Sequence, residues 1–267
     1  MKAASFAYAK PRALEEAFAL LARPEAKVLA GGQSLLPSLN MRLSSPELLV
    51  DINGLQELKG ISLERGVVRI GALATHAEIE RSKVVQEHLP LLAEAVRHVA
   101  HPAIRNRGTL GGSLALADPA AEYPACMLAM EAVIFVRGAN GTRQVPAADF
   151  FKGLFETDLK PGEILAAVEI TAQLKDERSV FLELARRHGD YAIVGLAAFA
   201  TSGTKRLAYF GAGDRAILAR NAAKAKDAES AKKALEKDLQ PPADLYHSSQ
   251  TKLHLAKVLL ERAWTKL

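Results

Sequence analysis

The chain has 267 residues, of which 49% are hydrophobic and 24% are charged, as in an ordinary folded protein and unlike a disordered one. Its 35 Lys and Arg residues and 30 Asp and Glu residues leave a net charge of +5, with an aromatic content of only 6%. Such a modest charge with few aromatic residues does not predict a nucleic-acid surface.

The single cysteine, Cys126, excludes an internal disulfide. It also excludes an iron–sulfur cluster ligated within this chain, because such clusters typically take four cysteine ligands. Its apolar neighbours predict a small core residue. The first residues, Met1 to Phe6, lack the apolar run of a signal peptide, and no stretch approaches about 18 apolar residues, so we expect a cytoplasmic protein without a membrane span.

The first part of the chain predicts a helix that covers a sheet. Apolar residues at helical spacing indicate an amphipathic helix over residues 12–23, which Pro24 ends. Short apolar runs predict strands at 27–30 and 47–52, and Gly66 marks the turn of a following strand–turn–strand unit.

The middle of the chain carries three helix signals. Thr75 and Glu78 form a capping box, in which side chains satisfy the first backbone N–H groups of a helix. Pro90 suits the first turn of a helix that contains Val99 and ends near His101-Pro102. Asp118-Pro119 predicts the N-cap and first turn of a third helix.

The remaining pattern predicts strands and then helices. A strand at 133–136 leads to the hairpin turn Asn140-Gly141, and a strand at 163–170 closes the first domain. From about residue 176 we expect a three-stranded antiparallel meander, with strands at 180–186, 192–200 and 207–211. Helices are predicted over 216–225, 229–237 and 251–266.

The segment Arg105 to Ser113 contains three glycines in five positions, Gly108, Gly111 and Gly112. Glycine permits positive φ and lets a ligand approach the main chain closely. Hydroxyl groups at Thr109 and Ser113, and positive charge at Arg105 and Arg107, accompany the glycines. We therefore expect an anion-binding nest of successive backbone N–H groups.

A second glycine segment, Ala30-Gly31-Gly32-Gln33-Ser34, comes earlier in the chain. Two such segments suggest one diphosphate held from two sides. Neither has the spacing of a Rossmann fingerprint or of a phosphate-binding P-loop, so a dinucleotide would need a different fold. The alternative is that each Gly-Gly pair makes a simple turn and that Ser34 and Thr109 are only turn or cap residues.

These segments resemble the flavin-binding motifs of the FAD subunits of molybdenum hydroxylases, the family of the carbon monoxide dehydrogenase medium subunit and the xanthine dehydrogenase FAD domain. Ala30 to Leu35 matches the first motif, and Thr109 to Ser113 matches the second, with Ser113 in place of the usual asparagine. Gly189-Asp190-Tyr191 is similar to a third segment of the family. The resemblance extends over essentially the whole chain.

The resemblance implies an α+β fold of the vanillyl-alcohol-oxidase type. The FAD-binding domain would span residues 1–175, in subdomains of about 1–54 and 55–175, and a small C-terminal domain with a three-stranded antiparallel sheet and helices would span 176–267. The residues that it implies for non-covalent FAD binding are Ala30, Gly31, Gly32, Gln33, Ser34, Leu35, Thr109, Gly111, Gly112, Ser113, Glu122, Leu165 and Tyr191. No His or Cys stands inside either glycine segment as a flavin attachment point.

Two of these residues have an alternative role. Glu122 is placed by the resemblance near the ribityl chain and ring of the flavin, or it is a first-turn carboxylate favoured by the helix dipole. The resemblance implies that Tyr191 stacks on the isoalloxazine; the alternative is a strand tyrosine that packs between domains. Arg186 and Arg187 face either the flavin or a partner, and the sequence leaves this open.

No catalytic residue or metal ligand is expected in this chain, since a flavin carries its own redox chemistry and His98-x-x-His101 is a weak metal signal. The resemblance implies an electron-transfer subunit that serves a large molybdenum-cofactor subunit and a small [2Fe-2S] subunit, as a dimer of heterotrimers, and reduces an external acceptor. The alternatives are a stand-alone FAD-dependent oxidoreductase acting on a small molecule and a nucleotide-binding scaffold without redox function.

Overall fold

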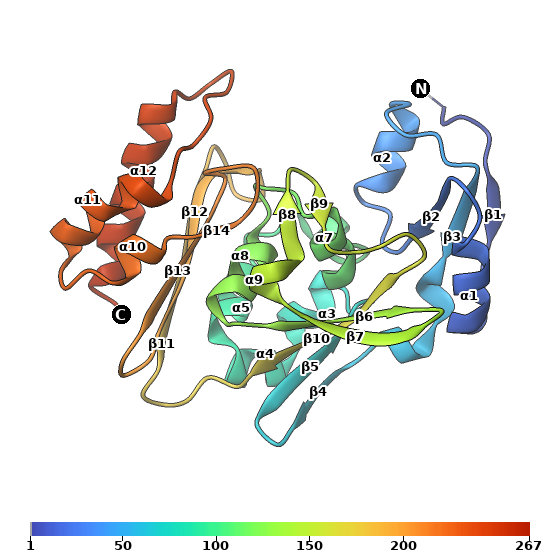
Figure 1. Cartoon of the computed structure of the whole chain (residues 1–267), viewed down its shortest axis with the longest axis horizontal. Helices are drawn as coiled ribbons and strands as arrows, with labels where there is room; N and C mark the ends of the chain where they lie inside the picture. The colour runs from blue at the N-terminus through green and yellow to red at the C-terminus, as the bar shows by residue number, and fades with distance from the viewer. Residues whose placement is uncertain (1) are drawn as a thin grey trace.

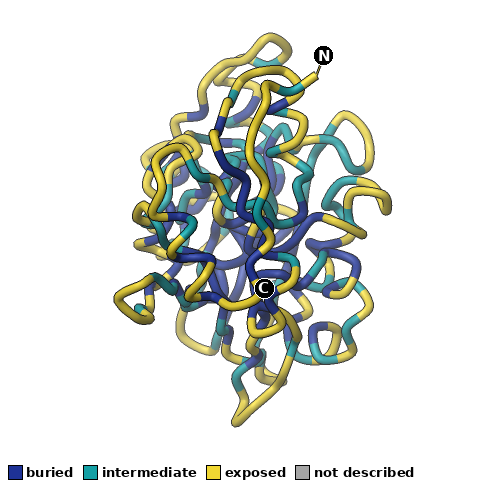
Figure 2. Tube along the Cα trace, turned by 90° about the vertical axis from the view of Figure 1, so that its right-hand side faces the viewer, coloured by how far each residue is buried: buried dark blue, intermediate teal, exposed yellow. Residues whose placement is uncertain are grey.

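The computed structural model describes residues 2–267, and its elements form three regions that follow the chain order (Figure 1). An N-terminal region carries a small parallel sheet, a central region carries a five-stranded antiparallel sheet with most of the helices, and a C-terminal region carries a four-stranded sheet and three helices. The tube in Figure 2 is buried along its middle and exposed at its outer turns. The mixed fold of helices and antiparallel C-terminal strands is the one expected.

The N-terminal sheet has the order β1-β3-β2, with both pairs parallel. Its strands are β1 (Ala7–Ala9), β2 (Ala26–Leu29) and β3 (Leu48–Asp51). The predicted helix is α1 (Leu14–Leu21), whose apolar face packs on the sheet. A six-residue helix, α2 (Leu35–Asn40), follows β2, and two 3-10 turns, η1 (Ile52–Gly54) and η2 (Gln56–Leu58), lead out of β3.

The central sheet has the order β4-β5-β10-β6-β7, and every pair is antiparallel. Its strands are β4 (Ile61–Glu64), β5 (Val67–Gly71), β6 (Val133–Gly138), β7 (Gly141–Pro146) and β10 (Ile164–Thr171). The hairpin at Asn140-Gly141 is confirmed by the β6–β7 pairing. A short ribbon, β8 (Phe151–Gly153) with β9 (Glu156–Thr157), follows the one-turn helix α9 (Ala147–Phe150).

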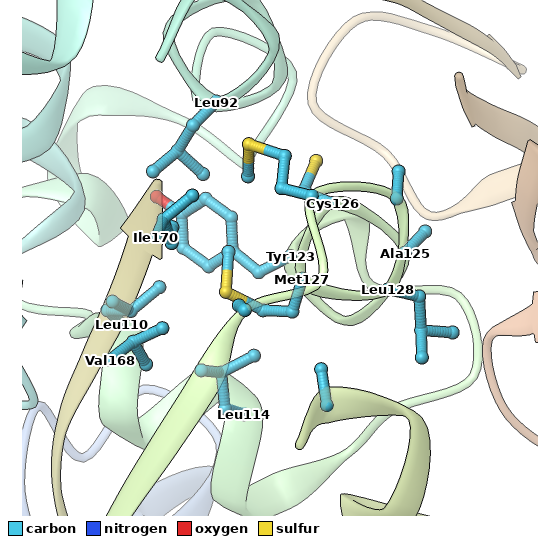
Figure 3. Packing of buried hydrophobic residues seen from close by; sticks show 14 of the residues in the cluster. Leu92, Leu110, Leu114, Tyr123, Ala125, Cys126, Met127, Leu128, Val168 and Ile170 are labelled. Atoms are coloured by element: carbon cyan, nitrogen blue, oxygen red, sulfur yellow. The ribbon is translucent and has the colours of Figure 1, made fainter. Parts of the chain in front are cut away.

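Six helices join β5 to β6 and cover this sheet. They are α3 (His76–Arg81), α4 (Lys83–His88), α5 (Pro90–Ala95), α6 (Pro102–Arg105), α7 (Leu110–Leu116) and α8 (Glu122–Ala129). The Thr75 capping box is confirmed, with both reciprocal hydrogen bonds present. Helix α8 is buried from Tyr123 to Ala129, and Figure 3 shows its Tyr123 ring among Leu92, Leu110 and Ile170.

The C-terminal sheet confirms the antiparallel meander and adds a strand. The order is β11-β12-β13-β14, from β11 (Arg178–Ala185), β12 (Ala192–Ala200), β13 (Lys205–Phe210) and the two-residue β14 (Ile217–Leu218). One face packs on α5 and α8, and the other is covered by α10 (Arg220–Ala223), α11 (Ala228–Asp238) and α12 (Ser249–Trp264). The sheet therefore lies between two helical layers (Figure 1).

Three local predictions need correction. Asp118 is not the N-cap of α8: its Oδ1 accepts a hydrogen bond from the N–H of Ala120 in a preceding turn, and α8 begins at Glu122. The helix that begins at Pro90 ends at Ala95, short of the expected end near His101-Pro102. Only residues 220–223 of the expected 216–225 helix are helical, because Ile217 and Leu218 pair with β13 instead.

Candidate functional site

A cleft of about 650 Å³ opens where the three regions meet, a size typical of ligand pockets. Both glycine segments and the Gly189–Tyr191 turn line it, and all thirteen residues expected at a flavin site are in its wall. A second cavity, of about 670 Å³, lies between the C-terminal end of α8, β13 and α10 and contains none of them. The structure therefore brings the predicted site residues together in one place.

The first glycine segment turns the chain from β2 into α2. Gly32 has a φ of +72°, so the expected left-handed glycine occurs here. The Nδ2 group of Asn53 holds the segment by donating to the Ala30 carbonyl at 2.8 Å. Within residues 2–267, the backbone N–H groups of Gly32, Gln33 and Ser34 have no acceptor, so this segment offers unused donors to the cleft.

The second glycine segment is built differently, and the prediction that its backbone N–H groups form an anion-binding nest is wrong. The N–H of Leu110 donates to the Ala74 carbonyl at 3.0 Å, and that of Gly111 donates to the Ala72 carbonyl at 2.8 Å. The Gly112 N–H donates a hydrogen bond to Thr109 Oγ1 at 3.1 Å. These donors are used inside the protein, and the segment forms the first turn of α7.

The glycines of the second segment serve packing. None of the three has positive φ, contrary to expectation. A Cβ at Gly111 would lie 2.5 Å from the Ala72 Cβ, and one at Gly108 would lie 2.6 Å from His76 Nε2. A Cβ at Gly31 would lie 2.2 Å from the Arg107 carbonyl oxygen, so the two glycine segments themselves abut.

The expected positive charge of the second segment is also turned away from the cleft. Arg105 is half-buried and donates to Glu80 Oε2 at 3.0 Å and to the carbonyls of Val99 and Ala100. Arg107 is exposed and does not line the cleft. The lysine in the cleft wall is Lys27, whose Nζ donates to Ser44 Oγ at 3.0 Å.

Glu122, the first residue of α8, lies in the cleft wall. Burial raises the pKa of Glu122 to about 7, and the nearby Asp118 carboxylate adds to this effect. Burial likewise raises the pKa of Asp118. The cleft thus contains a carboxyl group that is neutral or ionised in comparable amounts near pH 7, which suits proton transfer.

Tyr191 is 71% exposed, so the alternative of a tyrosine packed between domains is wrong. Its ring belongs to the cleft wall, which also contains apolar groups such as Leu165. Arg186 and Arg187 both pair with Asp190, at 3.3 and 3.4 Å, and neither lines the cleft.

Two residues that matter here were missed by the sequence analysis. His76, buried in the cleft wall, follows the Thr75 cap; burial, with a contribution from Arg105, lowers the pKa of its imidazole to about 4. Neither glycine segment contains a histidine in its sequence, but the fold packs His76 against Gly108 of the second segment. Glu183 lies deeper, on β11, and could have been found from strand alternation, which places it on the same face as Phe181.

Other features set limits on the site. No group of three metal-ligating side chains occurs within residues 2–267. Cys126 is buried, as expected, and burial raises the pKa of its thiol well above the usual range. No helix in the described part of the chain is both long and apolar enough to span a bilayer.

The residues present fit an FAD molecule. The unused N–H groups of the first glycine segment match the oxygens of a diphosphate, and the hydroxyls of Ser34 and Ser113 add polar partners. The exposed Tyr191 ring and the apolar Leu165 suit a flat aromatic ring system.

Comparison with known proteins agrees with this geometry. The family model described as "FAD binding domain in molybdopterin dehydrogenase" matches residues 4–172. The alpha subunit of the 6-hydroxypseudooxynicotine dehydrogenase complex of Paenarthrobacter nicotinovorans is 37% identical over 100% of this chain and 95% of its own length. The carbon monoxide dehydrogenase medium chain of Hydrogenophaga pseudoflava is 42% identical over 72% of this chain and 68% of its own.

Solved structures give the same result. A chain of the carbon monoxide dehydrogenase from Hydrogenophaga pseudoflava superposes with a TM-score of 0.95 at 36% identity, covering 100% of this chain and 98% of that one. A chain of quinoline 2-oxidoreductase from Pseudomonas putida 86 gives a TM-score of 0.93 at 39% identity, with the same coverage. This chain therefore belongs to the family of FAD-binding subunits of molybdenum-dependent dehydrogenases, and it is a subunit of an FAD-dependent oxidoreductase.

Proposed function

We propose that this chain is the electron-transfer subunit of a multi-subunit molybdenum hydroxylase. It would take electrons from iron–sulfur clusters of a small partner subunit and pass them through FAD to an external acceptor, while a large partner subunit with the molybdenum cofactor oxidises the substrate. We further propose that the three chains form a dimer of heterotrimers and that the flavin-binding domain ends near residue 175.

The observation that carries this proposal is the combination of a cleft lined by both glycine segments and Tyr191 with a chain that has one cysteine. An electron-transfer subunit needs a flavin site, and its iron–sulfur donors must then be held by another chain. The two relatives above are named as parts of larger enzymes, one as a subunit of a dehydrogenase complex and one as the medium chain of a dehydrogenase.

Within the cleft, each wall would hold a different part of FAD. The N–H groups of Gly32, Gln33 and Ser34 would bind the diphosphate, supported by the Ser113 hydroxyl. Tyr191 would cover one face of the isoalloxazine. The flavin supplies the redox chemistry, and the protein supplies binding and orientation.

The FAD would be held without a covalent bond. His76 lies against the second glycine segment, but its side chain is buried and Gly108 packs on its Nε2 atom. Acid precipitation of the yellow protein should release all flavin into the supernatant. Flavin retained on the precipitated polypeptide would contradict this assignment.

One observation favours the second candidate, a stand-alone FAD-dependent oxidoreductase. Glu122 is an acid in the cleft wall with a pKa of about 7, and such an enzyme would need an acid or base of this kind facing the flavin.

Native purification through a tag on this chain separates the two candidates. The proposal expects one larger and one smaller partner to co-purify in a fixed ratio, with molybdenum and iron in the complex and with flavin reduction by substrate. A chain that purifies alone with FAD and is reduced directly by a small organic molecule would support the stand-alone enzyme and contradict the proposal.

A further inference from the structure

The chain bends at Ala100, between α5 and α6, and this residue lies in the wall of the cleft. Ala100 has a φ of +45°, a left-handed conformation that is strained for a residue with a Cβ atom. Strained backbone of this kind persists only where other contacts hold it, and it is concentrated at ligand sites. The bend at Ala100 therefore needs contacts that hold it and a function that the strain serves.

Arg105, on α6, supplies the contacts that hold this bend. Its Nη1 atom donates to the Val99 carbonyl at 3.1 Å and to the Ala100 carbonyl at 3.0 Å. Its Nε atom donates to Oε2 of Glu80, on α3, at 3.0 Å. The Arg105 side chain is 11% exposed, so water competes little with these charge-assisted bonds. One guanidinium group thus ties α3 to both carbonyls of the bend.

The Gly189–Tyr191 turn packs on the same bend. Gly189 has a φ of +76°, and a Cβ added there would lie 2.6 Å from the Ala100 carbonyl oxygen and 2.9 Å from His101 Nδ1. A side chain at residue 189 is thus excluded both by the backbone conformation and by the neighbouring atoms. The carbonyl oxygen that Arg105 holds is therefore the surface on which the main chain of Gly189 packs.

Hydrogen bonds within the turn connect Gly189 to Tyr191. The Asp190 N–H donates to the Arg187 carbonyl at 3.2 Å, and the Tyr191 N–H donates to Asp190 Oδ1 at 3.0 Å. The Tyr191 ring itself is held little by packing, because the side chain is 71% exposed. The direction of this ring is therefore set by the backbone of the turn, and the turn is placed by its contact with Ala100.

We propose that Arg105 is a positioning residue for Tyr191: through the Ala100 carbonyl and Gly189 it holds the tyrosine ring where the isoalloxazine would bind. This rests on the proposed function, in which Tyr191 covers one face of FAD. The strain at Ala100 then has a reason. The left-handed bend directs two successive carbonyls to one guanidinium nitrogen, while the second of them also meets Gly189.

Arg105 acts on the ring through the bend and not by touching the ligand. Arg105 and Glu80 both lie outside the cleft wall, whereas Ala100, Gly189 and Tyr191 belong to it. The Nε and Nη1 atoms of Arg105 already donate to oxygens of the protein, so the guanidinium group is not directed at a phosphate in the cleft. Removal of Arg105 should therefore affect the ring end of the site and leave the diphosphate end intact.

Nuclear magnetic resonance relaxation of the FAD-free chain tests this connection without a ligand. In wild type we expect amide order parameters of about 0.85 at residues 189–191, and in Arg105→Gln values below about 0.6. Residues 194–199 of β12 should keep their wild-type values, which shows that the fold is intact. Arg107→Gln is the matched control, because it removes the same charge from an exposed side chain outside the cleft wall. Unchanged order parameters at residues 189–191 in Arg105→Gln overturn the proposal.

Binding measurements with two ligands test which end of the site Arg105 serves. Arg105→Gln should weaken FAD binding roughly two- to tenfold, the loss expected for an aromatic stack, and relieve quenching of flavin fluorescence. Affinity for ADP, which has the diphosphate and no isoalloxazine, should stay at the wild-type value. A loss of ADP affinity equal to that of FAD overturns the proposal, because Arg105 would then serve the phosphates.

The same change in a Tyr191→Ala background separates positioning from general stability. If Arg105 acts through Tyr191, Arg105→Gln should change neither FAD affinity nor flavin fluorescence further once the ring is absent. Equal losses in the two backgrounds would show that Arg105 acts independently of Tyr191, and this result overturns the proposal.

A second variant guards against misfolding of Arg105→Gln. Glu80→Gln removes the carboxylate that orients the guanidinium group and leaves both carbonyl bonds of Arg105 possible. It should lower the order parameters at residues 189–191 in the same direction by a smaller amount, and no change counts against the proposal. A wild-type chain that binds no FAD would instead contradict the proposed function, while the order parameters would still report whether Arg105 holds the turn.

Discussion

The two glycine segments of the cleft are similar in sequence and opposite in construction. Residues 32–34 present N–H groups that no atom of the described chain uses, whereas the N–H groups of residues 110–112 are all bound to the chain's own oxygens. The first segment has glycine where the backbone turns left-handed at Gly32, and the second has glycine where Gly111 packs on Ala72. A glycine-rich motif can thus serve a ligand directly or serve the packing that shapes the ligand's cleft.

The largest expected effect comes from adding side chains at the two kinds of glycine. Gly111→Val forces atoms into Ala72, because a Cβ added at Gly111 would lie 2.5 Å from the Ala72 Cβ and 2.8 Å from its carbonyl oxygen. We expect the FAD-free protein to lose about 3 kcal/mol or more of unfolding free energy, the upper part of the range for overpacking. A thermal melt followed by circular dichroism measures this loss.

Gly32→Val should behave differently in the same melt. Its cost in the FAD-free chain comes from a φ of +72°, roughly 1–2 kcal/mol, and its near neighbours are flexible ends of Leu29 and Leu36. FAD affinity should fall more than stability. Gly203→Ala is the control, because nothing lies within 4 Å of its added Cβ. Equal melting temperatures for the Gly111 and Gly32 variants would remove the distinction between the two segments.

The next effect concerns the carboxyl group of Glu122 in the cleft wall, whose neutral form is favoured by burial. The pKa of this carboxyl is about 7 in the folded chain, against an ordinary value of 4.5, so the folded state retains a proton that the unfolded state has lost. Wild type should therefore lose stability relative to Glu122→Gln as pH rises from about 4.5 to 7, by on the order of 1–3 kcal/mol. Melting temperatures of both FAD-free proteins across this range check the sign; parallel curves would show that Glu122 is ordinarily solvated.

A smaller effect separates the two hydroxyls, Thr109 and Ser34. Thr109 Oγ1 caps α7, so Thr109→Ala should destabilise the FAD-free chain by about 0.5–2 kcal/mol. Ser34 precedes α2 without a side-chain cap bond, so Ser34→Ala should leave the melt unchanged and weaken FAD binding by about 0.5–1.5 kcal/mol. Calorimetric titration with FAD and a thermal melt of each variant decide the matter. A destabilised Ser34→Ala protein would show that the Ser34 hydroxyl, like that of Thr109, stabilises the fold.

The sequence predicted which residues line the cleft, but it did not predict the hydrogen bonds that these residues make. The motif at residues 30–35 and the Gly189–Tyr191 turn line one cleft, and both could be read from the sequence because they are local signals at strand ends. The use of the Leu110 and Gly111 N–H groups depends on carbonyls of a distant segment, residues 72–74, which no local pattern reveals. Long-range pairing also hides the role of Arg105, whose partner is Glu80.

Missed elements of the fold have a similar cause. Helix α2 has six residues and β14 has two, and elements of this length carry too little periodic pattern to be read from sequence alone. The strands β11 and β12 were predicted closely because each runs for eight or nine residues with a continuous apolar face. Glu183 lies on the opposite face of β11, beside Phe181, and its side chain is only 2% exposed, so a charged residue at a core-facing strand position is a signal that the sequence carries.

Truncation of Tyr191 gives the smallest effect, and it tests whether the cleft binds a flat aromatic ring against this residue. Its side chain is exposed, whereas that of Tyr123, in the core on α8, is fully buried. Exposure of a large aromatic side chain is not required by the fold, so truncation should leave the melt of the FAD-free chain unchanged. If the ring stacks on the isoalloxazine, Tyr191→Ala should weaken FAD binding by roughly 0.5–1.5 kcal/mol and relieve quenching of flavin fluorescence.

Tyr191→Phe is the matched variant, since it keeps the ring and removes the hydroxyl. We expect Tyr191→Phe to match wild type in flavin fluorescence and in FAD affinity, because stacking depends on the ring, and Tyr191→Ala to differ in both. Removal of the ring also uncovers one face of the flavin, so reoxidation of reduced flavin by oxygen should be faster in Tyr191→Ala alone. Unchanged emission, affinity and reoxidation in Tyr191→Ala would show that the ring lies away from the flavin. The unused N–H donors of residues 32–34 would then be the main feature of the cleft that is directed at a ligand.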